Sequence, residues 1–499
     1  MAKYDVLIIG SGLSGLFSAL LLAKIGKRVC VLEKNQQYGG NLQTFERNNI
    51  LFDTGVHYIG GLAEKQVLYE YFNKVGITNK LSLERLDMNG YDRICFANTP
   101  SLMYPHAQGY ENFIQQLLLY FPSEKKALEQ YADTMQSVCA QFPLYNLKQG
   151  DAKYNTETLS IKLLDFLNSI TTDERLKAVL LGSNFLYGGT TEQTPLYVHA
   201  LSVNSYIESA WRLTQGGSQI TDLLIKQLQL HGADLFNNTE VTAFEYDSYN
   251  TISSIRTKQG KTFEASHIIS AIDIKQLLNI TGKVPLKPSF YKRVQCLKPT
   301  AAAFSLHLVL KPNIFRYLPY NIYWFKDNNS VYQAANYSIN NFPLSYMISM
   351  NPPKNGGEFT DNMTILTYMN PTELHRWEES FYTNTEGKSR GELYEIFKRQ
   401  RAMDLLDCVA LQFPTIKNII TDYYTSTPLT YRDYIGNFTG AMYGYKKNAD
   451  HIMESVFMPQ THIRNLYVTG QSVAMHGLVG VTISAVLTYQ ILMRSSGFL

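Results

Sequence analysis

The first 35 residues predict a strand, a helix and a second strand, in that order. Residues 4–9 form an almost continuous apolar run of strand length, residues 12–25 are apolar around spaced glycines, and residues 28–33 form another short apolar run. Buried parallel strands have this pattern, and a helix that crosses back to the next parallel strand gives a right-handed βαβ unit. We therefore predict a βαβ unit here rather than a signal peptide or a membrane-spanning helix.

Farther along, the periodicity changes from mostly helical to mostly strand-like. Residues 105–205 carry apolar side chains at helical spacing. Residues 295–430 instead predict strands that alternate with loops, including a strand at 302–310 and a turn at 327–329. Further elements are predicted as a helix at 220–230, strands at 239–246, 267–271 and 466–470, and a long apolar helix at 477–493.

This order of elements predicts an α/β protein whose Rossmann-like cofactor domain is discontinuous in sequence. At 499 residues the chain is too long for one ordinary core. The helical and strand-rich segments are then expected to form an inserted α+β substrate or cap domain. The predicted cofactor domain comprises residues 1–85, 212–290 and 425–499, and the predicted substrate domain comprises residues 86–211 and 291–424.

Charge and composition narrow the classes of partner. Lys plus Arg number 45 and Asp plus Glu 42, and the basic residues are scattered, which excludes nucleic acid as an expected partner. The chain is rich in aromatic residues, with 35 Tyr and 25 Phe, which suits an aromatic core, a pocket lining or a membrane-facing entrance. We predict a cytoplasmic protein, and peripheral contact with a membrane surface is left open.

The cysteines and histidines predict neither a disulfide framework nor a metal site. The five cysteines are odd in number and far apart, without a Cys-x-x-Cys pair, which fits a reducing compartment. Most histidines lack the spacing of metal ligands. Those interpreted as structural are His106, His199, His307 and His375.

A glycine motif follows the first predicted strand. Gly10 permits a tight turn, Gly12 lets the backbone approach a pyrophosphate, and Gly15 permits close packing of the helix on the strand. Ser11 and Ser14 lie in the same turn. The helix N-terminus that follows would face phosphate charge. A Gly-x-Gly-x-x-Gly motif alone is weak, but here its strand and helix are both present.

The second predicted strand ends in residues that suit the same ligand. Glu33 stands eighteen positions after Gly15, where a carboxylate can hold both ribose hydroxyls. Lys34 follows it, and a second glycine pair comes next, where the backbone would again pass close to a cofactor; the alternative is an ordinary loop. The predicted contacts of this segment are Glu33, Lys34, Gly39, Gly40 and Asn41.

Several of these motifs resemble one family. Residues 31–34, 39–40, 44–45 and above all 52–60, which read Phe-Asp-Thr-Gly-Val-His-Tyr-Ile-Gly, are similar to the phytoene desaturase, carotenoid isomerase and retinol saturase group of flavoproteins, within the amine-oxidase-like superfamily. The 52–60 run is most similar to the retinol saturase branch. The resemblance extends to residues 465–471 and 477–480 and touches Gly216, Gly217 and Val241.

The resemblance implies non-covalently bound FAD and a long apolar tunnel in the second domain. It also implies redox or isomerising chemistry on carbon-carbon double bonds of an apolar polyene or isoprenoid, such as a retinoid or carotenoid. No second dinucleotide motif is visible, so an external electron donor or acceptor is expected. The further residues that the resemblance assigns to the cofactor are Val56, Val241, Gly470, Gln471, Gly477, Leu478 and Val479.

Three residues are candidates for catalysis. Chemistry at a C=C bond needs a hydride and a proton, and in this superfamily the segment around His57 and Tyr58 passes beside the flavin ring. Either side chain can be the proton donor, or both merely pack against the flavin. His476 precedes the last predicted helix, where positioning is a stronger expectation than acid-base chemistry.

Two other functions remain as alternatives. One is an oxygen-using flavin oxidase of an amine or another small molecule. The other is a non-catalytic carrier of prenyl lipids with the same fold, which would lack bound flavin. The flavin-site motifs at both ends of the chain favour the enzyme.

Overall fold

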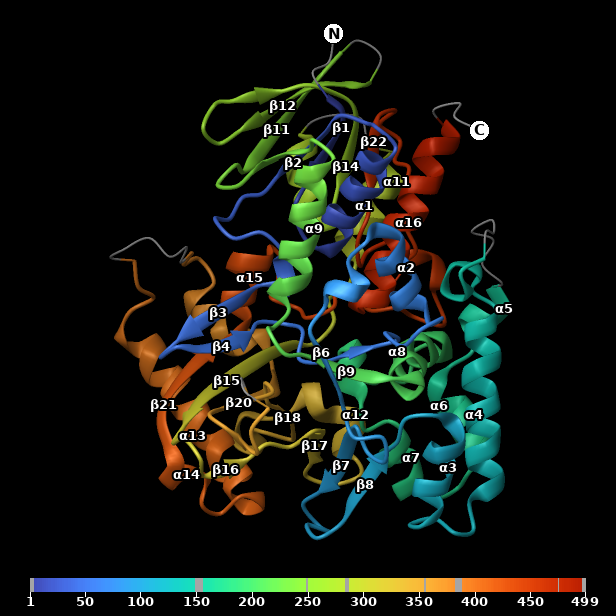
Figure 1. Cartoon of the computed structure of the whole chain (residues 1–499), viewed down its shortest axis with the longest axis vertical. Coiled ribbons are helices and arrows are strands. Elements are labelled where there is room, and N and C mark those ends of the chain that lie inside the picture. The colour runs from blue at the N-terminus through green and yellow to red at the C-terminus, as the bar shows by residue number, and fades with distance from the viewer. Residues whose placement is uncertain are drawn as a thin grey trace.

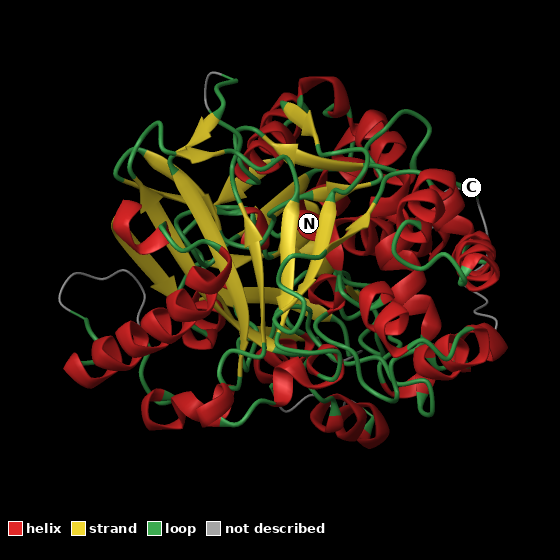
Figure 2. Ribbon diagram, turned by 90° about the horizontal axis from the view of Figure 1, so that it is seen from below, coloured by secondary structure: helices red, strands yellow, loops and turns green. Residues whose placement is uncertain are grey.

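The computed structural model describes residues 4–148, 156–247, 250–282, 287–353, 356–381, 388–473 and 475–495. Two sheets organise this part of the chain, one in the upper half of Figure 1 and one in the lower half. Strands fill the centre of the molecule, and helices lie around them in the view from below (Figure 2).

The upper sheet is parallel and contains the predicted βαβ unit. Helix α1 (Leu13–Lys24) connects its two N-terminal strands and contacts both α9 (Ser218–Leu230) and α16 (Gly477–Ser495). The sheet therefore gathers segments from both ends and the middle of the chain, as predicted. Its order is β10 (Asp234–Phe236), β2 (Val29–Leu32), β1 (Tyr4–Ile9), β14 (Ala265–Ser270) and β22 (Leu466–Val468).

The lower sheet has seven strands and is mostly antiparallel, with β7 and β17 as a parallel pair. Strand β15 matches the predicted strand at 302–310, and all nine of its residues are buried. The pairing of β7 with β17 places Asp92 opposite Asn321. The strand order is β21 (Ile420–Ser426), β15 (Ala302–Leu310), β20 (Asn362–Met369), β18 (Ser345–Ser349), β17 (Asn321–Phe325), β7 (Asp92–Phe96) and β8 (Met103–His106).

The predicted helical region forms a helical layer beside the lower sheet, on the right of Figure 1. Helix α8 lies at its centre, is buried along most of its length and contacts α4 and α6. The helices are α3 (Tyr110–Leu118), α4 (Lys125–Ala140), α5 (Thr156–Ser160), α6 (Leu163–Ile170), α7 (Glu174–Leu180) and α8 (Leu196–Glu208).

One prediction for residues 295–430 is wrong, because this stretch is not only strand and loop. It contains α13 (Glu392–Gln412), a helix of 21 residues. The amphipathic pattern of α13 is blurred: Leu393, Ile396 and Leu411 are exposed, whereas the charged Arg401 is buried. Ion pairs from Arg401 to Glu373 and Asp404 explain how that charge is accommodated.

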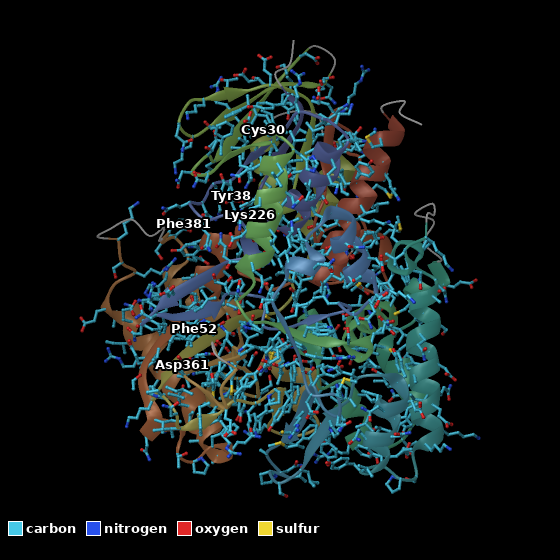
Figure 3. The ribbon with its side chains drawn as sticks, in the orientation of Figure 1. Cys30, Tyr38, Phe52, Lys226, Asp361 and Phe381 are labelled. Atoms are coloured by element: carbon cyan, nitrogen blue, oxygen red, sulfur yellow. The ribbon has the colours of Figure 1, made fainter. Side chains whose placement is uncertain are left out.

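Shorter elements connect the two sheets and complete the fold. The labelled Cys30 lies in the upper sheet, whereas Phe52 and Asp361 lie in the lower half (Figure 3). The remaining strands are β3 (Thr44–Arg47), β4 (Ile50–Asp53), β5 (Ile59–Gly60), β6 (Leu83–Arg85), β9 (Ala210–Leu213), β11 (Val241–Tyr246), β12 (Ile252–Thr257), β13 (Thr262–Phe263), β16 (Phe315–Arg316) and β19 (Phe359–Thr360). The remaining helices are α2 (Val67–Val75), α10 (Ile274–Thr281), α11 (Pro288–Cys296), α12 (Ser330–Gln333), α14 (Ile416–Ile419) and α15 (Pro428–Ile435).

Three further predictions bear on the fold as a whole. No disulfide bond links any of the five cysteines, all of which lie in the described part of the chain. Among the described helices, none is both long enough and apolar enough to cross a bilayer. The domain boundaries given above stay a prediction. Strand β21 (Ile420–Ser426) crosses the one between residues 424 and 425, and it pairs with β15 in the lower sheet.

Candidate functional site

A cleft of about 1950 Å³, its open mouth included, begins at the carboxyl ends of the parallel strands and reaches the lower sheet. Its walls include the residues that directly follow four strands of the upper sheet, namely Gly10, Glu33, Ala271 and Thr469. Ligands of open α/β sheets bind at this edge, where helix N-termini and strand ends meet. The cleft is therefore the candidate cofactor site.

The glycine turn after β1 has the geometry that the motif predicts. Gly10 has a φ of +94°, a conformation that favours glycine. A Cβ on Gly15 would lie 2.1 Å from the carbonyl oxygen of Gly10, so helix and strand pack too closely for any side chain. A Cβ on Gly12 would meet no protein atom within 4 Å, because this residue faces the cleft.

The first turn of α1 leaves its backbone N–H groups available to a ligand. Its N-cap is Gly12, which offers no side-chain cap, and the turn contains no acidic residue. Uncapped N–H groups and the helix dipole together attract phosphate.

Glu33 lines the cleft, but its carboxylate is already engaged by its own loop. One oxygen accepts hydrogen bonds from the backbone N–H of Ser11 at 3.0 Å and from its hydroxyl at 2.6 Å. The other accepts from the backbone N–H of Asn35 at 2.9 Å. These bonds fix the carboxylate at the cleft wall, where Oε1, which accepts a single bond, keeps a lone pair for a ribose hydroxyl.

The second glycine pair packs against the first turn. Gly39 and Gly40 have φ values of +112° and +56°, and a Cβ on Gly40 would lie 3.2 Å from Cα of Gly12. Lys34 also lines the cleft and donates to the carbonyl oxygen of Asp433 at 2.9 Å. The segment therefore lies beside the glycine turn and lines the same part of the cleft.

Two unsatisfied polar atoms show that this cleft suits a polar ligand. The Oδ1 atoms of Asn41 and Asn437 are buried and have no hydrogen-bond partner, and both residues line the cleft. Buried polar atoms without partners are rare in folded proteins and cost about 1–3 kcal/mol each. Together with the open face of Gly12 and the uncapped helix, they fit a dinucleotide.

Most of the predicted cofactor residues line this one cleft, although they come from both ends and the middle of the chain. Two do not: Gly15 lies beneath the turn, and Val479 lines a neighbouring cavity. Those that line the cleft, beyond the ones described above, are Ser11, Ser14, Val56, Val241, Gly470, Gln471, Gly477 and Leu478.

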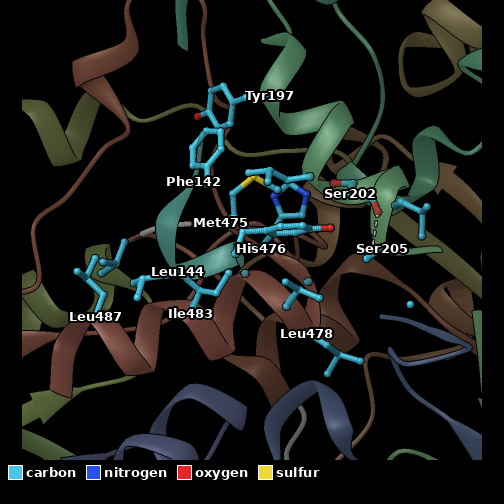
Figure 4. A pocket seen from close by; sticks show the side chains of 18 of the residues that line it. Phe142, Leu144, Tyr197, Ser202, Ser205, Met475, His476, Leu478, Ile483 and Leu487 are labelled. Carbon is cyan, nitrogen blue, oxygen red and sulfur yellow. Dashed lines mark hydrogen bonds between the residues drawn. The ribbon is translucent and has the colours of Figure 1, made fainter. Parts of the chain in front are cut away.

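A second cavity of about 1370 Å³, open parts included, joins the cleft between α8 and α16. The two share Leu186, Tyr206, Tyr443, Gly477 and Leu478, and we call this set of five residues the junction. Figure 4 shows apolar side chains such as Phe142, Leu144, Ile483 and Leu487 around the second cavity. None of its described lining residues is Asp, Glu, Lys or Arg.

Of the three predicted catalytic residues, His57 and Tyr58 line the cleft, and His476 lines the second cavity. The ring centroid of His476 is 4.7 Å from that of Tyr443, and its Nε2 is buried without a partner. Burial lowers the pKa of His476 to about 3, and burial together with the charge of Arg212 lowers the pKa of His57 to about 4. Both imidazoles are therefore neutral at pH 7 and are poor proton donors.

Tyr58 lines the cleft and has two hydrogen-bond partners that sequence reasoning missed. Its hydroxyl donates to Oδ2 of Asp92 at 2.8 Å and lies 2.6 Å from the hydroxyl of Tyr323. Burial raises the pKa of Tyr58 well above its ordinary value. Tyr206, Tyr323 and Tyr443 were also missed, because no local motif surrounds them and only the fold brings them together.

Comparison with known proteins identifies the family and the fold. Residues 13–379 match the family described as flavin containing amine oxidoreductase. The chain is 27% identical to the rat all-trans-retinol 13,14-reductase, over 97% of this chain and 85% of the rat protein. It is 22% identical to prolycopene isomerase 2 of an Oncidium hybrid cultivar, over 99% of this chain and 85% of that protein. An oxidoreductase structure from Methanosarcina mazei superposes with a TM-score of 0.66 at 14% identity, over 98% of this chain and 100% of that one. The two proteins therefore share a fold.

Proposed function

Because the chain belongs to the flavin containing amine oxidoreductase family, we propose that it is an FAD-dependent oxidoreductase that adds two hydrogens across a carbon-carbon double bond of an apolar polyene. A retinoid is the substrate class that we favour, since a relative of almost the same extent is named a retinol reductase. Desaturation and cis-trans isomerisation are alternatives on the same substrate class.

FAD fits the residues of the cleft from end to end. Gly10, Gly12 and the first turn of α1 would hold the pyrophosphate, and Glu33 would hold the adenosine ribose. The N-terminus of α16 and the segment at Val56 line the other end, where the flavin ring would lie. FAD would supply the hydride, while the protein must orient the substrate, exclude water and move a proton.

The uncharged second cavity is the observation that carries this proposal. Its apolar walls would bury a hydrocarbon chain, at roughly 25 cal/mol for each Å² removed from water. At the junction, one part of that chain would then lie beside the end of the cleft proposed for the flavin ring. A long apolar molecule with its reacting bond at the junction fits this shape.

An amine substrate fits the same walls less well. A protonated amine is costly to bury without a carboxylate or another acceptor nearby, and the described walls of the second cavity carry no acidic side chain. The oxygen-using amine oxidase therefore remains the second candidate.

Electron supply and membrane contact are part of the proposal. The sequence contains no second dinucleotide motif for a nicotinamide cofactor, so an external electron donor has to reduce the flavin. An apolar polyene resides in membranes, which favours contact with a membrane surface in a protein expected in the cytoplasm. Flotation with phospholipid vesicles checks that contact directly.

The test is to purify the protein, record its visible spectrum and add all-trans-retinol or a carotenoid to dithionite-reduced protein without oxygen. We expect a flavin spectrum and a product heavier by two hydrogens by mass spectrometry. Loss of two hydrogens with the oxidised protein would mean desaturation, and an unchanged mass with a new retention time would mean isomerisation. Peroxide release on amine addition would instead support the amine oxidase. A colourless protein that retains lipid would support the prenyl-lipid carrier.

A further inference from the structure

Asp92 is a buried carboxyl group that joins two tyrosines at the cleft. It is fully buried at the start of β7. One oxygen, Oδ2, accepts from Tyr58 at 2.8 Å and from the hydroxyl of Ser183 at 3.1 Å, and Oδ1 accepts from the side-chain amide of Asn321 at 2.9 Å. A chain of hydrogen bonds therefore runs from Asp92 through Tyr58 to Tyr323.

This chain ends at the place where the reacting bond must lie. Both Tyr58 and Tyr323 line the cleft, and the ring of Tyr58 lies 4.6 Å from that of Tyr206, a junction residue. The Tyr58 hydroxyl forms hydrogen bonds with both Asp92 and Tyr323. Among the described residues, the hydroxyl of Tyr323 has a single hydrogen-bond partner, Tyr58. Tyr323 is thus the end of the chain that keeps hydrogen-bonding capacity for the cleft.

The surroundings of Asp92 contain few charges. Burial raises the pKa of Asp92 to about 7, although hydrogen bonds and the Arg212 guanidinium oppose this. Arg212 reaches Asp92 only through Asn321, whose oxygen accepts from it at 2.8 Å. His106, which contacts Ser183 at 3.0 Å, has its pKa lowered to about 4 by burial and is neutral. The other titratable neighbours are the tyrosines Tyr58, Tyr91, Tyr206 and Tyr323.

We propose that Asp92 is the proton reservoir of the reaction and that Tyr58 and Tyr323 relay its proton to the substrate. This inference rests on the proposed function. When Asp92 is protonated, the hydrogen bonds run the other way: the carboxyl donates to Tyr58, and Tyr58 donates to Tyr323. Bound reduced flavin would supply a hydride to one carbon, and Tyr323 would give its hydroxyl proton to the neighbouring carbon. Tyr58 would replace that proton and Asp92 would replace the one from Tyr58, so the double bond would gain two hydrogens and Asp92 would end as a carboxylate.

The first test needs neither substrate nor turnover. Infrared difference spectra of the purified protein are recorded while the pH is changed from 5 to 9. We expect two protonated carboxyl bands that disappear near pH 7, one from Asp53 and one from Asp92. The Asp92 band should shift in Tyr58→Phe and be absent in Asp92→Asn. If that band is missing, or is unchanged in Asp92→Asn, Asp92 is ionised throughout and the relay is wrong.

The second test is the rate of a single turnover of the reduced protein in D₂O. We expect Asp92→Asn and Tyr323→Phe to lower the rate of deuterium incorporation at carbon by about 100-fold or more, within the range of general acid catalysis. The matched control is Tyr110→Phe, which removes a buried hydroxyl bonded to Asn204 at 2.7 Å, away from both cavities. A rate in Asp92→Asn equal to that of the control would overturn the relay.

A merely structural role of Asp92 gives a different result. Asparagine keeps the size of the side chain. If Asp92 only stabilises the fold through its hydrogen bonds, Asp92→Asn should have a lower melting temperature. The relay further predicts that the wild-type rate falls as the pH rises through about 7, where Asp92 loses its proton, and that Asp92→Asn loses this dependence. If polyenes do not react at all, the proposed function fails, while the infrared titration still decides the state of Asp92.

Discussion

The two ends of the cleft are built in different ways. At the nucleotide end, the turn at Gly10–Gly15 and the loop at Glu33–Asn41 come from 32 consecutive residues and bond to each other directly. At the flavin-ring end, Tyr58, Asp92, Tyr323 and Tyr443 come from four separate parts of the chain. The proposed function therefore assigns cofactor binding to backbone shape at the first end and the chemistry to buried side chains at the second.

The difference means that the two ends should respond to different substitutions. At the nucleotide end, one added methyl group should lower the amount of FAD that the protein binds. At the ring end, substitutions should leave FAD in place and change substrate binding, rate or pH dependence.

The largest effect is expected from added methyl groups in the glycine turn. In Gly15→Ala the new Cβ would lie 2.1 Å from the Gly10 carbonyl oxygen, so we expect a loss of stability of about 3 kcal/mol and no bound flavin. In Gly12→Ala the Cβ projects into the cleft, so the protein without FAD should melt as the wild type does. Its FAD affinity should fall about 10- to 100-fold, equivalent to the cost of about 1–3 kcal/mol for overpacking.

Calorimetric titration of FAD and melting curves of the flavin-free variants separate these outcomes. Gly357→Ala is the matched control, since this exposed glycine has no close neighbour that a Cβ would strike. Full FAD affinity in Gly12→Ala would mean that the pyrophosphate does not lie against this turn.

The nucleotide end was predictable from the sequence because its contacts are local. Gly10, Gly12, Gly15 and Glu33 act through a turn and two strand ends, which a single pattern describes. The ring end was only partly predictable: His57, Tyr58 and His476 were found through the resemblance, but Asp92 and Tyr323 were not. Their meeting depends on the parallel pairing of β7 with β17, two strands more than 200 residues apart.

The next effect is expected in the second cavity. Ser202 lies on α8 and lines it (Figure 4), so Ser202→Phe would fill space without touching the cofactor cleft. We expect KM for the polyene to rise about 10-fold or more because the apolar chain loses room, while the flavin content stays at the wild-type level. Ser202→Ala is the control at the same position. An unchanged KM in Ser202→Phe would show that the substrate reaches the flavin by another path.

A smaller effect is expected from His57, the local candidate for proton transfer. Its pKa is lowered to about 4, so its imidazole stays neutral from pH 5 upward and does not supply the proton. His57→Gln should therefore change the rate less than about 10-fold and keep the fall in rate near pH 7 that we assign to Asp92. Rate measurements from pH 5 to 9 check this. If the pH dependence disappears in His57→Gln, the histidine is the acid after all.

The smallest effect concerns stability at His307, a buried histidine on β15 of the lower sheet. His307 is packed between Phe45 and Phe52, with ring centroids 5.0 and 5.4 Å away, and burial lowers its pKa from 6.5 to about 3. The unfolded chain thus takes up a proton at this site before the folded one does. Its contribution to stability is complete above pH 6.5 and is lost as the pH falls toward 3.

Other buried histidines with lowered pKa values act in the same direction, whereas Asp53 and Asp92, with pKa values raised to about 7, act in the opposite one. We expect the histidines to dominate and the melting temperature to fall between pH 7 and pH 5. His307→Phe should reduce that fall, because it removes one titrating group from an aromatic cluster, and the exposed His231→Phe should not. An equal fall in both variants would mean that the folded protein protonates His307 as readily as the unfolded chain does.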